Sequence, residues 1–338
     1  MIVAVEETLA HASNVLVYSA MAVYTGALGA FALDLAGRGA RPVAAAVPER
    51  AVVVAAAPVG GPDSGARSGS AGSVEAATAE APRPRWANAG GIAVSLTWLA
   101  FLLQLAAVVA RGISAGRAPW GNMYEFAVTG SLVVTGAFLV VLRRRDVRYL
   151  GTFVVGPVLL TLGLAVAVLY TPSAGLVPAL QSYWLLIHVT VAFVASALFT
   201  LGFSTSVLQL VQHRRERVRA VGREPRRGRF MEALPPSDEL ERSAYRLHVV
   251  AFPLWTFTVI AGAIWAEHAW GRYWNWDPKE VWSFVIWVVY AGYLHARSTR
   301  GWDGRRAAWF AIAGYACVLF NFLVVNIFFV GFHSYSGV

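Results

Sequence analysis

Long apolar segments separated by short polar connections fill most of this chain of 338 residues. A helix needs about 20 apolar residues to cross the ~30 Å hydrocarbon core of a bilayer. Backbone groups in lipid must be satisfied within the segment, which favours helix over open strand. The pattern predicts an all-α, polytopic membrane helix bundle of about eight transmembrane helices, over residues 14–36, 89–110, 125–142, 149–170, 183–210, 249–269, 279–296 and 307–330.

The basic residues lie almost entirely in alternate connections. Of the 28 Lys and Arg residues, 24 fall in four segments, 37–85, 143–148, 211–246 and 297–306. Positively charged loops stay on the cytoplasmic side. The bundle is therefore predicted to have both termini on the outer face of a bacterial plasma membrane, and residues 211–246 are interpreted as a solvated basic loop.

Three regions are predicted from this pattern. Residues 1–36 form the first transmembrane helix with an outer N-terminal segment, and acidic Glu6 and Glu7 argue against a cleaved signal peptide. Residues 37–85, rich in Ala, Pro, Gly and Ser, are predicted to be a disordered cytoplasmic linker. Residues 86–338 form the main transmembrane domain.

Composition narrows the possible functions. The chain is 57% hydrophobic and 14% charged, against about 25% charged in soluble domains. The net charge of +9 is assigned to topology and lipid headgroups, not to nucleic acid. The single cysteine, Cys317, allows no intrachain disulfide and is interpreted as an apolar filler. No nucleotide-binding, metalloprotease or serine-hydrolase motif is found.

One outer connection has an unusual composition: residues 270–282 read WGRYWNWDPKEVW. Asp277, Pro278 and Glu280 fit the cap, first position and capping box of a helix beginning at about Pro278. Capping does not explain the tryptophans, six of which lie between Trp265 and Trp287. They form either an interfacial aromatic belt or a platform for a large flat ligand, whose anionic groups would meet Arg272 or Lys279.

The seven histidines divide into two groups. His11 and His213 are expected to be solvated, and His248 and His268 to be locally hydrogen-bonded. His188 and His333 lie at outer ends of predicted helices, on the same face as the tryptophans. Two imidazoles beside an aromatic platform can supply both axial positions of a haem iron. His295 falls about 26 Å along its helix, near the inner boundary, where a ligand and a headgroup contact remain equally open.

These motifs together resemble the tryptophan-rich WWD domain of haem-handling proteins. The segment at 270–282, YLHAR around His295 and HSY at the C-terminus are most similar to the CcsA/ResC type of cytochrome c biogenesis protein. WGNMYEF at 120–126 and LQSYWLLIHV around His188 are similar as well. The resemblance runs from about Trp86 to the C-terminus.

The resemblance implies a subunit of the system II cytochrome c synthase. Such proteins act with a ResB-type membrane partner, receive haem b from the cytoplasmic side and present it at the outer face to CxxCH of apocytochrome c. Reduced thiols come from separate thiol-reducing membrane proteins. No residue of this chain is assigned as catalytic, and whether it is by itself a haem lyase is left open.

Site residues carried over from the family follow by position. His188 and His333 match the outer axial pair, and His295 matches an in-membrane ligand whose companion histidine belongs to the ResB-type partner. The haem-contacting loop residues are Trp270, Arg272, Trp274, Trp276, Asp277, Lys279 and Trp282. Two alternatives remain: a system I haem-handling protein, and a haem or small-molecule transporter, although transporters often carry inverted repeats and none is visible.

Overall fold

The computed structural model describes residues 2–39, 88–173, 180–223, 229–299 and 302–333. These residues are helical and include no β-strand, so the predicted all-α class is confirmed. The long helices are α1 (Ile2–Gly39), α2 (Ala89–Ala115), α3 (Met123–Arg144), α4 (Gly151–Ala167), α5 (Tyr183–Ala220), α6 (Ser237–Trp270), α7 (Pro278–Ser298) and α8 (Arg305–Leu319). Short elements are η2 (Arg148–Leu150), η4 (Arg229–Ala233), the π-helix η5 (Phe320–Val325) and α9 (Asn326–Phe328).

Every predicted span coincides with a helix. Seven helical segments of the described chain are long and apolar enough to cross a membrane, the last running from α8 through α9. The remaining predicted span, 279–296, corresponds to α7, which carries charged residues near both ends and packs beside α8. The chain is a multi-pass membrane protein.

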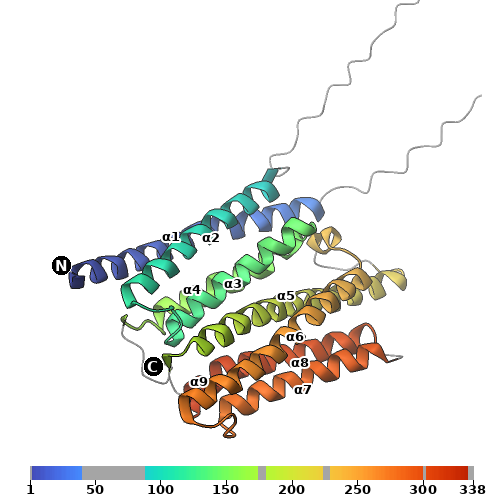
Figure 1. Ribbon diagram of the computed structural model, residues 1–338. Helices are drawn as coiled ribbons and strands as arrows, with labels where there is room; N and C mark the ends of the chain where they lie inside the picture. The colour runs from blue at the N-terminus through green and yellow to red at the C-terminus, as the bar shows by residue number, and fades with distance from the viewer. Residues whose placement is uncertain (1, 40–87, 174–179, 224–228, 300–301, 334–338) are drawn as a thin grey trace, which may run out of the picture.

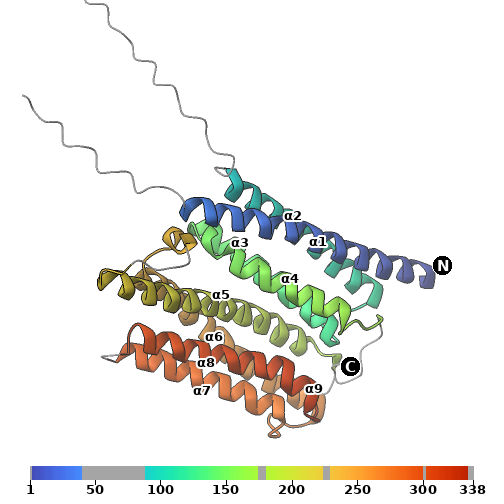
Figure 2. The same cartoon turned by 180° about the vertical axis from the view of Figure 1, so that it is seen from behind.

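The helices form a bundle of two halves (Figures 1 and 2). In the first half α1 packs along α2, and α3 and α4 pack against each other and against the α1–α2 pair. In the second half α5 packs along α6, and α7 and α8 complete the group. The start of α1 and the end at α9 lie at the same end of the bundle, as an even number of spans requires (Figure 1). Following the predicted orientation, we call this the outer end.

At the inner end α5 and α6 are longer than predicted. The interpretation of 211–246 as a loop was wrong at both edges, because α5 continues to Ala220 and α6 begins at Ser237. Arg, Glu and Ala are good helix formers in water as well as in apolar surroundings. Glu232 accepts from Arg215 and Arg219 at 2.6 and 2.9 Å, which holds η4 against the extension of α5.

The predicted linker is tested only at its edge. Helix α1 runs to Gly39, three residues past the predicted boundary at 36. Residues 40–87 lie outside the described residues, so the interpretation of 37–85 as a disordered linker stays a prediction.

Candidate functional site

The loop between α6 and α7 ends in the capping box that the sequence predicted. Asp277 accepts from the Lys279 amide at 3.0 Å, and Glu280 Oε2 accepts from the amides of Asn275 and Asp277 at 2.8 and 3.1 Å. Trp276, between them, has a φ of 56°, the only positive φ of a non-glycine in the described chain. A left-handed residue costs about 1–2 kcal/mol, and here it lets the amides of Asn275 and Asp277 point at one carboxylate.

Asp277 also binds the C-terminal segment. Its Oδ2 accepts from the Phe332 amide at 2.6 Å, and its Oδ1 accepts from His333 Nδ1 at 2.9 Å. The residue is only 5% exposed. Burial by itself would raise the pKa of this carboxyl, but the hydrogen bonds from His333, Lys279 and Phe332 outweigh burial and hold the pKa below its usual value. Asp277 therefore stays a carboxylate that joins the start of α7 to His333.

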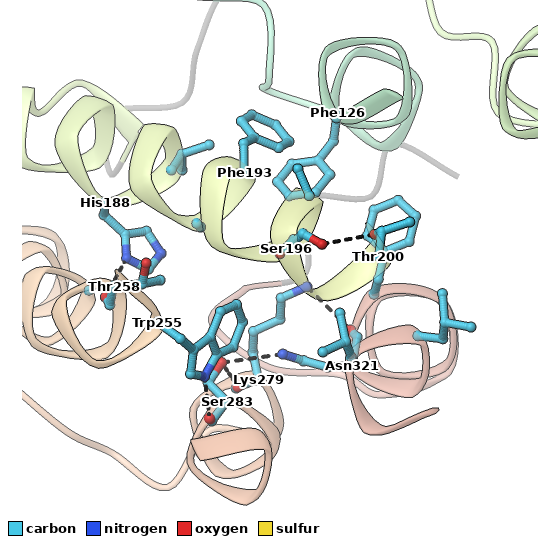
Figure 3. Close-up of a pocket in the computed structure, with 18 of the residues that line it drawn as sticks. Phe126, His188, Phe193, Ser196, Thr200, Trp255, Thr258, Lys279, Ser283 and Asn321 are labelled. Carbon is cyan, nitrogen blue, oxygen red and sulfur yellow. Dashed lines mark hydrogen bonds between the residues drawn. The ribbon is translucent and has the colours of Figure 1, made fainter. Parts of the chain in front are cut away.

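The His188 imidazole is oriented in the same way from another helix. Its Nδ1 lies 2.8 Å from the backbone carbonyl of Thr258 on α6, so Nδ1 carries the proton and donates (Figure 3). His333 also donates through Nδ1, to Asp277. Neither Nε2 makes a hydrogen bond within the described residues. An imidazole fixed through Nδ1, with the Nε2 lone pair free, is arranged as a metal ligand.

Trp265 lies against both imidazoles. Its ring stacks on His188 at 6.0 Å between centroids and 16° between planes, and meets His333 edge-on at 5.4 Å. Trp270 contacts Trp265 at 4.8 Å and His333 at 4.9 Å. Two histidines that are 145 positions apart in the sequence thus share one aromatic wall at the outer end.

Both imidazoles line a cavity of about 280 Å³ that extends inward between the two halves of the bundle. Tyr273 and Trp274 line its outer part, and Thr200 and Tyr315 line it deeper in the membrane. Most of the lining is apolar, with a few polar groups. Three polar lining atoms are buried without a hydrogen-bond partner among the described residues, and these are Thr258 Oγ1, Glu280 Oε1 and Asn321 Oδ1. Unsatisfied buried polar atoms mark a place where a ligand or ordered water belongs.

Lys279 brings a positive charge to this cavity. Its ammonium group hydrogen-bonds Asn326 Oδ1 and lies 3.4 Å from the Asn321 carbonyl (Figure 3). Asn321 belongs to the π-helix η5, and Asn326 follows it directly. A π-helical turn departs from the regular α-helical bonding pattern and occurs often at functional sites. The half-buried amine thus lines the same cavity as the two imidazoles, where an anionic group can meet it.

The predicted loop residues fall into two sets. Trp270 contacts His333, while Trp274 and Lys279 line the cavity, and Asp277 holds His333. The remaining loop residues point elsewhere: Arg272 is exposed and donates to Asn275 at 3.0 Å, Trp276 is 75% exposed, and Trp282 packs on Phe320 at 4.1 Å. His295 lies near the inner end of α7, is exposed, and is not among the cavity-lining residues.

Sequence reasoning assigned no contact with His188 to three residues of α6. Thr258, Gly262 and Trp265 fall on one helical face and all touch His188. A Cβ at Gly262 would lie 2.7 Å from His188 Cε1, so only glycine leaves room for the ring. Their spacing of four and three residues is the signal that could have identified them.

Two further histidines had been assigned local hydrogen bonds. His268 bonds the Ile264 carbonyl at 2.8 Å, as expected. His248 does not: it is fully buried, and neither ring nitrogen has a partner in the described chain. Its ring lies among Phe199, Tyr290 and Tyr293, at 5.1–6.0 Å between centroids. Aromatic packing replaced the predicted hydrogen bond because α5 and α7 enclose this part of α6.

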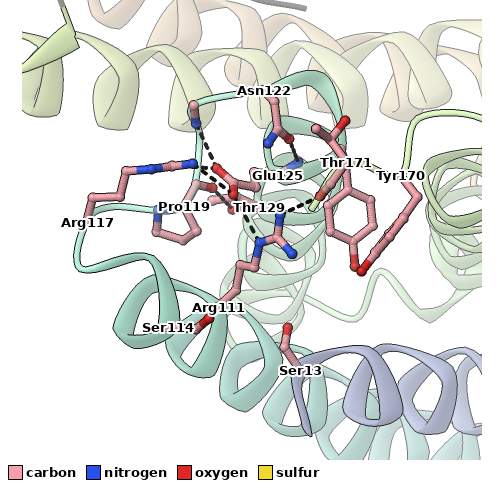
Figure 4. A network of polar contacts seen from close by, with 12 residues as sticks. Ser13, Arg111, Ser114, Arg117, Pro119, Asn122, Glu125, Thr129, Tyr170 and Thr171 are labelled. Atoms are coloured by element: carbon pink, nitrogen blue, oxygen red, sulfur yellow. Dashed lines mark hydrogen bonds and ion pairs between the residues drawn. The ribbon is translucent and has the colours of Figure 1, made fainter. Parts of the chain in front are cut away.

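The segment WGNMYEF forms a second polar cluster at the outer end (Figure 4). Glu125 accepts from Arg111 at 3.0 Å and from Arg117 at 2.6 Å, and Arg111 also donates to the Thr171 carbonyl at 2.6 Å. All three charged side chains are buried. The cluster ties the α2–α3 connection to the end of α4.

The same segment supplies part of the cavity wall. Phe126 follows Glu125 directly and packs on Phe193 of α5 at 4.4 Å, and both line the cavity. Trp120, at the other end of the motif, lies 6.2 Å from Phe193. The buried ion pairs of the cluster therefore fix one side of the space into which His188 points.

Comparison with known proteins defines the class. Residues 120–333 match the family described as "Cytochrome C assembly protein", and the chain belongs to this family. The matched range contains Glu125, the tryptophan-rich loop and both outer histidines.

Curated relatives are named "Cytochrome c biogenesis protein CcsA". The one from Synechococcus sp. (strain JA-2-3B'a(2-13)) is 35% identical over 302 residues, covering 73% of this chain and 84% of the relative. The one from Gloeothece citriformis (strain PCC 7424) is 32% identical, covering 78% and 91%. The chain is of the CcsA type, which confirms the resemblance seen in the sequence.

A solved structure shares the fold. The protein titled "Cytochrome c Heme Lyase CcmF" aligns with a TM-score of 0.59 over 93% of this chain, at 16% identity. The chain spans about half of that protein, 47% of its length. At 16% identity, this similarity is evidence only for the arrangement of the helices. A role in cytochrome c maturation follows from the family and its CcsA-type relatives.

Proposed function

We propose that this chain receives haem b and presents it at the outer face of the bacterial plasma membrane for attachment to CxxCH of apocytochrome c, as a subunit of the system II synthase with a ResB-type partner. One observation carries the proposal: His188 and His333 open on one cavity, each fixed through Nδ1 with Nε2 free. The two imidazoles are the axial ligands in this proposal. Bis-histidine ligation leaves no open position for oxygen on the iron.

The wall of the site suits a flat, apolar substrate with two carboxylates. Trp265 and Trp270 cover the imidazoles, and Trp274 lines the outer cavity. Aromatic surface of this kind stacks well on a large ring system. Lys279 is the better-placed partner for a propionate, because it lines the cavity whereas Arg272 is exposed and bonds Asn275.

Attachment of haem to the peptide requires that the two be held in one geometry, and it requires no protein nucleophile. In thioether formation a thiol S–H adds across a vinyl group: one C–S and one C–H bond form, and the S–H and π bonds break, with no net oxidation. Holding substrate and peptide in one geometry lowers such a barrier by converting a bimolecular step into an intramolecular one. Cys317 lies within α8, outside the residues that line the cavity, so it takes no part in this proposal.

His295 is proposed to act before this site, as one ligand of haem within the membrane. His295 is exposed on α7, which leaves it accessible to a companion histidine of a ResB-type partner packed against this helix. Apocytochrome c and thiol-reducing membrane proteins are the other proposed partners.

Absorption spectra of the chain co-purified with its ResB-type partner test the proposal. We expect low-spin bis-histidine haem that is reduced in His188→Ala and His333→Ala and restored by added imidazole. Cytochrome c maturation should fall in both variants at unchanged protein level. His268→Ala, an exposed histidine at the same end, is the matched control and should keep both signals. Haem indifferent to both outer substitutions would overturn the proposal.

A further inference from the structure

Asp277 gathers hydrogen bonds from two segments that meet only at the site. The Lys279 amide comes from the first turn of α7, and the Phe332 amide and His333 imidazole come from the chain after α9. These donors occupy both carboxylate oxygens, and the residue is almost fully buried. The carboxylate therefore cannot rotate without breaking a backbone contact.

The C-terminal segment is shaped to reach this carboxylate. An added Cβ at Gly331 would overlap Asp277 Oδ2. A close approach of backbone to carboxylate is thus possible only with glycine at this position. It places the Phe332 amide 2.6 Å from Oδ2 and His333 Nδ1 2.9 Å from Oδ1.

The two outer imidazoles have different partners at Nδ1. His188 donates to the neutral carbonyl of Thr258, whereas His333 donates to a carboxylate. A charge-assisted hydrogen bond is roughly twice as strong as a neutral one, and a carboxylate at Nδ1 raises the basicity of a ligating imidazole. The structure therefore makes the two candidate ligands unequal.

We infer that Asp277 is the positioning residue of the outer site, fixing His333 through Nδ1 so that His333 is a stronger iron ligand than His188. This rests on the proposed binding of haem between the two histidines. A stronger donor favours ferric over ferrous iron, so the Asp277 charge lowers the reduction potential of bound haem. Asp277 acts through His333 and does not itself touch the iron.

Asp277→Asn is the direct test, because an asparagine oxygen in the place of Oδ1 keeps the acceptor for His333 and for the helix cap, whereas the charge and the acceptor of the Phe332 amide are removed. In the complex with the ResB-type partner we expect retained low-spin haem and a raised reduction potential. A tenfold loss of ferric preference corresponds to about 59 mV for one electron. Asn122→Ala, which removes the cap of α3 at the same end, is the control and should leave the potential unchanged.

A second measurement leaves Asp277 intact and compares haem retention in His188→Ala and His333→Ala. Removal of His333, the ligand that a carboxylate supports, should lower haem affinity more than removal of His188. His333→Ala is therefore expected to release haem about 10-fold more readily than His188→Ala, within the range seen for such supporting partners. Equal retention in the two variants, or an unchanged potential in Asp277→Asn with haem bound, would overturn the inference. Wild-type complex without bis-histidine haem would instead reject the proposed function itself.

Discussion

Gly262→Ala is expected to change the geometry of the site without lowering the stability of α6. The added methyl would lie 2.7 Å from His188 Cε1 and 2.8 Å from Nδ1, whereas ordinary van der Waals contact begins at 3.4 Å. The imidazole must therefore move by about 0.7 Å, which stretches its hydrogen bond to the Thr258 carbonyl. In the proposed haem site the metal–ligand distance must stay within about 0.2 Å of its normal value, so displacement of the ring would weaken or break its bond to iron.

The same substitution should not unfold the helix. Alanine is favoured over glycine inside a helix by about 1 kcal/mol, which offsets the local crowding. Gly91 on α2 is the matched control, since a Cβ there meets nothing within 4 Å. We expect both variants to be purified at wild-type yield, with the low-spin haem spectrum lost or weakened in Gly262→Ala alone. A wild-type spectrum and normal maturation in Gly262→Ala would refute the placement of His188 as a ligand.

Three further tests, which use four substitutions, have outcomes that follow from the structure. Lys279→Gln should weaken haem retention in the purified complex while Arg272→Gln leaves it unchanged, because only the lysine lies in the cavity. Glu125→Gln should lower stability by about 3–5 kcal/mol, measured as a fall in thermal unfolding temperature, because two buried arginines lose their carboxylate. Trp276→Gly should raise stability by up to about 1 kcal/mol in the same assay, because its positive φ strains tryptophan and its indole is 75% exposed; a marked loss would show that the indole is held by contacts.

Local signals in the sequence predicted the parts of the site that depend on neighbouring residues. The capping box of α7 depends on Asp277 and Glu280, three positions apart, and the structure has it as predicted. The shared end of His188 and His333 followed from the count of spans and the charge of the loops. The double role of Asp277 was not predictable, because its contact with His333 joins residues 56 positions apart through the packing of α7 and η5.

Other features of the structure were not predicted from the sequence, for different physical reasons. Charge was taken as a sign of a loop at 211–246, although Arg215 and Glu232 form an ion pair that helps extend α5 in water. His248 was expected to form a hydrogen bond, and only the packing of α5 and α7 shows that three aromatic rings lie around it. The cavity depends on the π-helix η5, whose irregular turn has no recognised sequence signal here.

In the tryptophan-rich loop, Asp277, Lys279 and Glu280 point inward, while the side chains of Arg272 and Trp276 are exposed. Asp277 and Glu280 close the start of α7, and Lys279 enters the cavity between them. The left-handed backbone at Trp276 makes this arrangement possible, because it directs the amides of Asn275 and Asp277 to Glu280 and leaves the Trp276 indole exposed. A loop that served only as an interfacial belt would need neither the strained turn nor a carboxylate held against an imidazole.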